Sequence, residues 1–291
     1  MAEAFNVDRF MEGSGKIDLS DIDWSEVPRY RLTPEALRTV RYVMRTESST
    51  FFYAKAFMNT TAAVREPDLA PFLSAWMYEE EFHGRAFRRF LEAYGEHIPN
   101  DARPDQFRTR STGERIDELG QAALSYAFPD DWPAAHMVWG SIQEFTTYSA
   151  YQALIERTDH PILHVICQRI MKQELRHFAF YREHAKKRLT RSVTARRLAS
   201  FALRMAWTPV GDGMSPKDEV IHAIRFLFDG VDGTAIDRID RKTRELPGLE
   251  WFDLFSRFAE RHAIRQAPAT WTSRLRGEAH APGEAVPTPA S

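Results

Sequence analysis

The sequence of 291 residues has little of what secreted or membrane proteins are built from. Its single cysteine, Cys167, excludes an intramolecular disulfide, and the expected location is a reducing compartment, the cytoplasm. No apolar run approaches the roughly 20 residues that cross a bilayer, so we expect no membrane span. Residues 1–30 are acidic and interrupted by Gly13-Ser14-Gly15, which is unlike a signal peptide.

Neither sign of charge is in excess. The formal net charge is −2 at pH 7, from 39 Lys and Arg against 41 Asp and Glu, so no general affinity for nucleic acid is expected. Hydrophobic residues make up 43% of the chain, enough to bury a large core. This composition suits a globular enzyme, and only the sequence motifs can indicate which reaction it catalyses.

A carboxylate-histidine pattern occurs twice. Glu47 lies 33 residues before Glu80-Glu81-Phe82-His83, and Glu144 lies 30 residues before Glu174-Leu175-Arg176-His177. Residues three apart share a helix face, so the Glu and His of each unit can reach one point. A Glu from each of two helices and an ExxH from each of two others is the ligand arrangement of di-iron four-helix bundles. The repeat therefore predicts a two-metal site.

The charge of this ligand set also favours metal ions. Four buried carboxylates would be very costly without compensation, whereas two divalent cations neutralise them. Carboxylate and imidazole ligands suit iron or manganese better than structural zinc, and two iron ions are our first choice. The alternative interpretation is two surface Glu/His pairs on amphipathic helices. The predicted ligands are Glu47, Glu80, His83, Glu144, Glu174 and His177.

A third unit, Glu219-Val220-Ile221-His222, is not expected to bind metal. It has no matching partner unit and falls after the long helices. A chain of this length should contain about one ExxH by chance.

Capping and breaking residues divide the chain into helices. The first is expected from Thr33-Pro34-Glu35 to about Val64, and the second from Asp68 to Tyr94. The third is expected over 131–157 and the fourth over 161–189, with a short helix near 113–126 in the long connection. Two hairpins joined by one long crossover predict an all-α, ferritin-like four-helix bundle.

We accordingly divide the chain into four parts. Residues 1–32 form an N-terminal extension, and 33–189 form the bundle with its metals. Residues 190–276 hold accessory helices packed on the bundle, at about 190–206, 215–229, 233–245 and 249–264. Residues 277–291, rich in Ala, Pro and Gly, form a tail that is expected to be disordered.

Three segments resemble the soluble acyl-[acyl-carrier-protein] desaturases. Residues 75–84, AWMYEEEFHG, are similar to the tryptophan-containing EExxHG segment of that family, and residues 173–177, QELRH, to its DExRH segment. Residues 143–147, QEFTT, are similar to its QExxT segment. The resemblance covers about residues 30–210. It implies a homodimeric di-iron enzyme that uses O2 and two electrons from a ferredoxin to place a cis double bond in an acyl chain carried on acyl carrier protein.

The resemblance also implies a catalytic role for Thr147, one helical turn after Glu144. Its hydroxyl could donate a hydrogen bond at the metals or relay a proton. The alternative is a hydroxyl that bonds back to the carbonyl of Gln143 or Glu144. Side chains at helical offsets from the ligands could line an acyl tunnel or simply belong to the core; they are Met44, Phe51, Tyr148, Tyr151 and Tyr181.

One position departs from the family. Gln173 stands where the family has an aspartate before the fourth-helix ligand. A metal-bound His usually donates its second ring proton to an outer carboxylate or carbonyl. Gln173 can accept through its amide oxygen but brings no charge. We expect its counterpart, Glu79, to support His177 across the bundle.

Basic side chains follow the fourth helix. Residues 182–204 carry eight Lys or Arg against one Glu, a surface suited to an acidic carrier protein. Docking is expected at Lys186, Lys187 and Arg188. The same residues also suit the C-terminal end of a helix.

Other interpretations stay open. The protein could be another di-iron oxygenase of the superfamily, either a hydroxylase or an N-oxygenase. An N-oxygenase would be expected to carry a further His where Ile170 stands. A ribonucleotide reductase small subunit would carry a tyrosine at Phe87. An iron-binding protein without an acyl substrate is another. The acyl length, the double-bond position, and a coenzyme A carrier in place of acyl carrier protein are not decided by the sequence.

Overall fold

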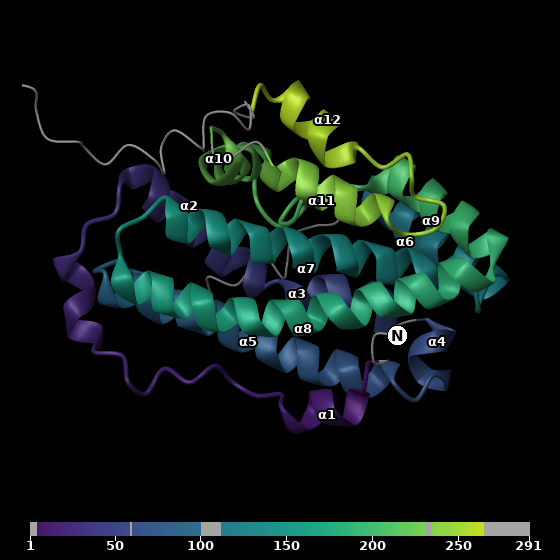
Figure 1. Ribbon diagram of the computed structural model, residues 1–291, viewed down its shortest axis with the longest axis horizontal. Coiled ribbons are helices and arrows are strands. Elements are labelled where there is room, and N and C mark those ends of the chain that lie inside the picture. Colours follow the sequence, from purple (N-terminus) through teal and green to yellow (C-terminus); the bar gives the residue numbers. More distant parts are fainter. Residues whose placement is uncertain (1–4, 59, 100–111, 231–233, 265–291) are drawn as a thin grey trace, which may run out of the picture.

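The computed structural model describes residues 5–58, 60–99, 112–230 and 234–264, so the predicted tail over 277–291 lies outside it. In these residues the protein is a helical bundle without a β-strand, which confirms the predicted all-α class. Its long helices are α2 (Pro34–Glu47), α5 (Leu69–Ala93), α7 (Pro133–Glu156) and α8 (Pro161–Arg191). Helix α7 packs along α8, and α2 packs along α5 (Figure 1).

The four long helices begin close to where the sequence indicates, and α5 begins at Leu69, directly after the predicted Asp68. The Thr33 hydroxyl accepts a hydrogen bond from the Ala36 N–H, and Pro34 occupies the first turn of α2. Pro133 and Pro161 stand at the same place in α7 and α8. The long connection from α5 to α7 contains α6 (Thr112–Ala127), close to the short helix that was predicted there.

The prediction of one continuous helix over 33–64 is wrong. The chain forms α2, then α3 (Thr50–Met58) and α4 (Thr61–Arg65). At the first break, the Ser49 hydroxyl donates to the Arg45 carbonyl and the Thr50 hydroxyl to the Glu47 carbonyl. Such side-chain bonds compete with the backbone hydrogen bonds of a helix. The break makes Glu47 the last residue of α2.

The accessory helices follow the predicted order. They are α9 (Val193–Ala206), α10 (Lys217–Phe228), α11 (Thr234–Arg244) and α12 (Leu254–Arg261). Helix α9 packs on α7 and α8, and α10 packs on α2 and α7. Two short elements were not predicted, the helix α1 (Val7–Glu12) and the 3-10 helix η1 (Trp24–Arg29), both of which contact α5. The first part of the chain therefore covers one side of the bundle.

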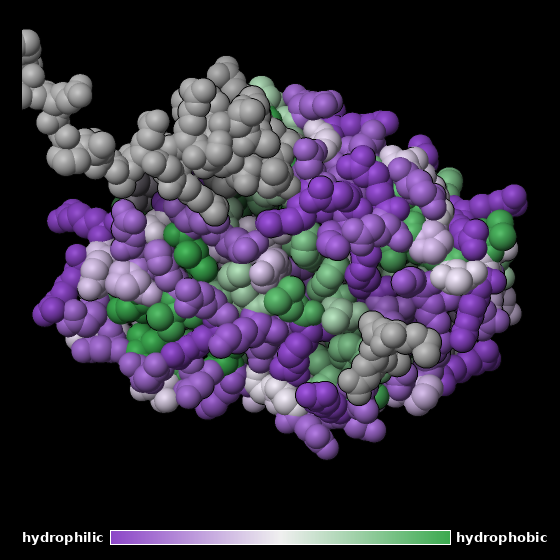
Figure 2. Space-filling model, viewed as in Figure 1, coloured by the Kyte–Doolittle hydropathy of each residue, from purple (hydrophilic) through white to green (hydrophobic). Residues whose placement is uncertain are grey.

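The surface and the lone thiol agree with the composition. Among the described helices, none combines the length and apolarity that a bilayer crossing requires. The face drawn in Figure 2 is mostly hydrophilic, with hydrophobic side chains in separate groups. Cys167 is buried, and this burial raises the pKa of its thiol, so it is an unreactive core residue.

The chain at the end of α2 approaches α5 closely at Gly84. A Cβ atom on Gly84 would lie 2.4 Å from the Ser48 hydroxyl oxygen and 3.1 Å from the Ser48 nitrogen. Ser48 follows Glu47, and Gly84 follows His83. The glycine thus lets the backbones of two ligand-bearing helices meet directly beside their ligands.

We expect Gly84→Ala to lower the free energy of unfolding by about 1–3 kcal/mol, because the added methyl group separates α2 from α5. Gly120→Ala on the exposed face of α6 is the matched control, since nothing lies within 4 Å of a Cβ atom there. That change should be neutral, or stabilising by up to about 1 kcal/mol. Urea unfolding of both variants checks this, and equal effects would refute the close approach.

Candidate metal centre

Six acidic and imidazole side chains meet in the interior of the bundle. Each of the helices α2, α5, α7 and α8 contributes at least one, and none of the six is more than 5% exposed. Their nitrogen and oxygen atoms form two overlapping groups, and within each group these atoms lie within 4.8 Å of one another. The members are the residues predicted from the repeat: Glu47, Glu80, His83, Glu144, Glu174 and His177.

The first group surrounds one ring nitrogen of His83. Its Nδ1 lies 3.5 Å from Glu47 Oε2, 3.8 Å from Glu80 Oε2 and 3.3 Å from Glu174 Oε1. Atoms that share an ion at about 2.1 Å are about 3.0 Å apart when they bind at right angles. These distances therefore match a set of ligands around a single ion, slightly expanded.

The second group surrounds His177 in the same way. Its Nδ1 lies 3.1 Å from Glu80 Oε1, 3.4 Å from Glu144 Oε2 and 3.6 Å from Glu174 Oε2. Glu80 and Glu174 thus direct one oxygen to each histidine. Two carboxylates shared in this manner would bridge a pair of ions.

The hydrogen bonding of the cluster tests whether metal ions fit it. Buried polar atoms are almost always hydrogen-bonded, so an unpartnered group requires an explanation. Six atoms of this cluster have no hydrogen-bond partner, and they face the two centres just described. A pair of divalent cations would satisfy all of them. They are Glu47 Oε2, Glu80 Oε1, His83 Nδ1, both carboxylate oxygens of Glu174, and His177 Nδ1.

Both histidines have a strong affinity for protons in the metal-free protein. Burial alone would lower the pKa of His83, but the carboxylates of Glu174, Glu47 and Glu80 outweigh it and raise that pKa well above 6.5. The surrounding carboxylates likewise outweigh burial and raise the pKa of His177. A metal ion must therefore displace a proton from each ring.

The four carboxyl groups divide into two pairs. Burial, assisted by neighbouring negative charge, raises the pKa of Glu47 and of Glu144 well above 4.5. For Glu80 and Glu174 the two histidines outweigh burial, and the pKa of each is lowered. Two protonated histidines then balance the charge of two ionised carboxylates. The metal-free cluster is thus neutralised by protons, whereas metal ions would neutralise the four carboxylates of the loaded cluster.

The second ring nitrogen of each histidine has an outer partner. His177 Nε2 lies 2.7 Å from Glu79 Oε2, the contact expected from the sequence. His83 Nε2 lies 2.7 Å from the amide oxygen of Gln173, and the NH2 group of Gln173 donates to Glu79 Oε1 at 2.9 Å. These contacts orient both rings with Nδ1 toward the centres.

Each lone glutamate has an aromatic donor that the sequence did not reveal. The Tyr151 hydroxyl donates to Glu47 Oε1, and the Trp76 indole donates to Glu144 Oε1 at 3.1 Å. Tyr151 lies two helical turns after Glu144, and its residue type alone does not distinguish this role from core packing. Both donors fix a carboxylate oxygen and leave the other one to face the cluster.

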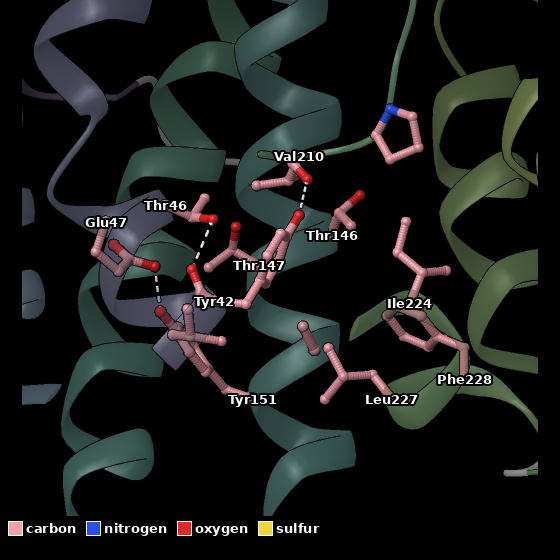
Figure 3. Close-up of a pocket in the computed structure, with 13 residues that line it drawn as sticks. Tyr42, Thr46, Glu47, Thr146, Thr147, Tyr151, Val210, Ile224, Leu227 and Phe228 are labelled. Atoms are coloured by element: carbon pink, nitrogen blue, oxygen red, sulfur yellow. Dashed lines mark hydrogen bonds between the residues drawn. The ribbon is translucent and has the colours of Figure 1, made fainter. Parts of the chain in front are cut away.

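A small cavity adjoins the cluster on the side of Glu47 (Figure 3). It has a volume of about 40 Å³ and lies between α2, α7, α10 and the segment that contains Pro209 and Val210. The Tyr42 hydroxyl donates to the Val210 carbonyl and closes one side. The lining is mainly apolar and consists of Tyr42, Val43, Thr46, Glu47, Thr146, Thr147, Ala150, Tyr151, Pro209, Val210, Ile224, Leu227 and Phe228.

Of the five predicted tunnel residues, only Tyr151 lines this cavity. Phe51 was wrongly assigned, since it lies on α3 with 65% of its surface exposed. Met44 is buried in the core, and Tyr148 stacks on Phe145. Tyr181 packs its ring edge against Trp76 on the other side of the cluster.

Thr147, the predicted catalytic residue, borders the cavity. Its neighbour Thr146 donates back to the Ile142 carbonyl at 2.7 Å. For Thr147 itself no hydrogen bond is seen within the described parts of the chain. Its hydroxyl therefore remains available to a molecule in the cavity.

The predicted docking surface loses one of its three residues. Lys186 and Lys187 are exposed, but Arg188 is buried and donates to Glu66 and His184, so it is not available to a partner. The exposed residues border a hollow of about 330 Å³ with Glu183, Thr190 and Arg191. The third ExxH unit lies elsewhere, as expected: Glu219 pairs with Arg38, and His222 is hydrogen-bonded to the Glu35 carbonyl.

The comparisons with known proteins agree with this geometry. A family model described as fatty acid desaturase matches residues 36–206, more than half of the chain. The matched range runs from α2 to the end of α9 and includes all six residues of the cluster. The comparison with curated proteins found no match. With its helical bundle and buried carboxylate-histidine cluster, the chain belongs to the fatty acid desaturase family.

Proposed function

We propose that the protein is an O2-dependent di-iron oxidoreductase that places a cis double bond in a fatty acyl chain carried on acyl carrier protein, with electrons from a ferredoxin. One observation carries this proposal: a buried set of four carboxylates and two histidines, arranged for two ions, adjoins an apolar cavity at Glu47. Iron with O2 and two electrons would supply an oxidant strong enough for an unactivated methylene group.

The protein's own residues orient the substrate and exclude water. Val43, Ala150 and Leu227 would contact the hydrocarbon chain, and Thr147 also lines the cavity, with a hydroxyl that has no hydrogen bond among the described residues. Glu47 is fixed at one oxygen by Tyr151, so its other oxygen keeps its direction while the substrate binds. Positioning of this kind decides which carbon atom reacts.

The partners are proposed from charge. Lys186 and Lys187 stand exposed on the last turns of α8 and border the hollow beside Arg191. An acidic carrier protein would be attracted to this surface. The homodimer that the family resemblance implies belongs to the same proposal, and sedimentation of the purified protein tests it.

The function is tested by loading the purified protein anaerobically with Fe(II), reducing it with ferredoxin and admitting O2, with and without a long-chain acyl carrier protein. Mass spectrometry then compares the acyl chain before and after. Loss of two hydrogen atoms per chain supports the desaturase, and gain of one oxygen atom identifies a hydroxylase. Iron binding with consumption of O2 but no acyl product would reject the acyl substrate.

The size of the cavity favours a second candidate, oxygenation of a smaller apolar substrate. Sites for drug-sized ligands usually measure about 300–1,000 Å³, whereas this cavity measures about 40 Å³. A long acyl chain would require this cavity to enlarge. A small substrate requires no such enlargement, and the product analysis separates the two candidates.

We expect Leu227→Trp to lower formation of the oxidised acyl product at least about tenfold, since filling a hydrophobic pocket excludes ligand atoms. Bound iron per protein chain should stay unchanged, because Leu227 lines the cavity and is no ligand. Leu227→Met, which conserves volume, is the matched control and should retain activity. Equal activity of the tryptophan and methionine variants would show that the substrate binds elsewhere.

A further inference from the structure

The main chain of Gly15 touches both outer partners of the histidines. Its carbonyl accepts a hydrogen bond from Gln173 Nε2 at 2.8 Å, and its N–H donates to Glu79 Oε1 at 3.1 Å. Gln173 and Glu79 are also bonded to each other. A residue from the first part of the chain thus completes a polar network that begins at His83 and ends at His177.

A neutral amide is the side chain that this network requires at position 173. The oxygen of Gln173 accepts from His83, and its NH2 group donates both to Gly15 and to Glu79. A carboxylate in its place would offer only acceptors, and it would face the carboxylate of Glu79 and the carbonyl of Gly15. The contact with Gly15 therefore depends on a glutamine.

The segment before Gly15 is held by the same helix that carries His177. Arg176, the neighbouring residue, donates to the carbonyls of Gly13 and Phe10, at 2.8 Å each, and to the Ser14 hydroxyl at 3.0 Å. The Arg176 guanidinium also lies 4.6 Å from the ring centre of Phe10.

The Phe10 ring packs inward on the bundle. It is 3% exposed, and its centre lies 5.1 Å from that of Phe72 and 6.1 Å from that of His177. At the start of the segment, the Phe5 N–H donates to Glu183 on α8 at 2.7 Å. Residues 5–15, here called the N-terminal strap, therefore lie against α5 and α8 on the outer side of the two histidines. Figure 1 shows α1 beside α5.

We propose that binding of metal and docking of the N-terminal strap are coupled through Gln173 and Glu79. The strap holds the two outer partners, these hold the Nε2 atoms of the histidines, and the histidines direct Nδ1 to the metals. Gln173 is thus a positioning residue that serves both metal positions through His83 and Glu79. The inference rests on the proposed metal site and is independent of the acyl substrate.

The strength of the coupling between metal binding and strap docking can be estimated from the hydrogen bonds of Gln173 and Glu79. Loss of an outer partner of a metal-bound histidine lowers metal affinity by about 10–100-fold. Coupling between two binding events is reciprocal, so the metals should favour the docked strap by the same factor. Exchange of the strap's amide hydrogens should slow accordingly, because amides exchange when the strap opens.

The experiment measures hydrogen exchange of peptides that cover residues 5–17 in the full-length protein. It compares the protein stripped of metal with a chelator and the same protein loaded anaerobically with Fe(II). Calorimetric titration of Fe(II) gives the affinity. Arg176→Met removes the three hydrogen bonds to the strap and a 3.5 Å ion pair with Glu79 Oε1, without changing a ligand; Gln173→Leu leaves this ion pair in place. Arg182→Met is the matched control, since Arg182 lies on the same helix but donates to Lys242 and Glu245 instead. Gln173→Leu tests the network itself.

In the unaltered protein we expect Fe(II) to slow exchange of the strap by about 10-fold or more. In Arg176→Met and in Gln173→Leu, the affinity for Fe(II) should fall by a similar factor and the metal-dependent protection should disappear. Arg182→Met should keep both. Circular dichroism establishes that each variant is folded.

Two results would overturn the coupling. If Fe(II) binds at two ions per chain while exchange of the strap stays the same, the strap does not respond to the metals. If Arg176→Met frees the strap and leaves the affinity unchanged, the metals do not depend on it. Failure of the unaltered protein to bind Fe(II) would instead reject the metal site, and the coupling with it.

Discussion

Replacement of Glu80 by alanine is expected to abolish binding of the two proposed metal ions and to lower the proposed O2-dependent activity by more than about a hundredfold. Glu80 directs one oxygen to the His83 group and the other to the His177 group, so a single change damages both positions. Outer partners of metal ligands already contribute about 10–100-fold to affinity, and a ligand shared by two ions should exceed this range. Iron per chain, measured by mass spectrometry of the metal, checks the expectation.

Two matched variants make this result specific. Glu81→Ala changes the next residue, whose carboxylate pairs with Arg85 on the outer face of α5. Glu219→Ala changes the third ExxH unit, which lies far from the cluster and pairs with Arg38. Both should retain two ions per chain. Loss of iron in either variant, or normal iron in Glu80→Ala, would contradict the assigned ligand set.

The affinity for Fe(II) is expected to rise steeply with pH. Four groups of the cluster have a raised pKa in the metal-free protein: Glu47, Glu144, His83 and His177. Metal ions bind the deprotonated forms, so loading releases up to four protons. Each proton released makes the affinity increase about tenfold per pH unit below the pKa of its group. Titrations at several pH values, in buffers of different ionisation enthalpy, count these protons.

The stability of the metal-free protein should change with pH in the opposite direction. A histidine whose pKa is raised by folding stabilises the fold fully below its unfolded value, here 6.5, and loses this contribution as pH rises through the folded-state pKa. The metal-free protein should therefore unfold more easily as pH rises above about 6.5, while the loaded protein becomes more stable. Urea midpoints that move in parallel with and without Fe(II) would contradict this account.

The ligands could be predicted because their geometry is local. Glu80 and His83 share a face of α5 whatever surrounds the helix, and the second copy of the motif supplied the opposite half of the site. The order of the bundle helices followed from prolines, caps and loop lengths in the same way. The helix order and the position of each Glu/His pair depend on residues close together in the sequence, so no tertiary contact is needed to predict them.

The wrong assignments have equally physical causes. Phe51 was placed four residues after Glu47 on one helix face, but the break at Ser48 and Ser49 turns α3 away, and the ring lies at the surface. Lys186, Lys187 and Arg188 are consecutive, so their side chains point in directions about 100° apart, and on a helix packed against the bundle one of them can turn inward. Arg188 turns inward to Glu66.

The outer network depends on contacts that no local pattern contains. Gly15 meets Gln173 across 158 positions of sequence, and it does so through main-chain atoms that any residue possesses. Tyr151 reaches Glu47 across 104 positions. Only the tertiary fold reveals these partners, which is why the sequence indicated the six clustered residues but not the contacts that hold them.

The two halves of the site share one sequence pattern, but the outer hydrogen-bond partners of their histidines differ. His177 is bonded to a carboxylate, whereas His83 is bonded to an uncharged amide. A carboxylate partner increases the basicity of an imidazole more than an amide does. His177 would therefore be the stronger electron donor of the two imidazoles, and two ions held here would be expected to differ in reduction potential, with the ion beside His83 the easier one to reduce.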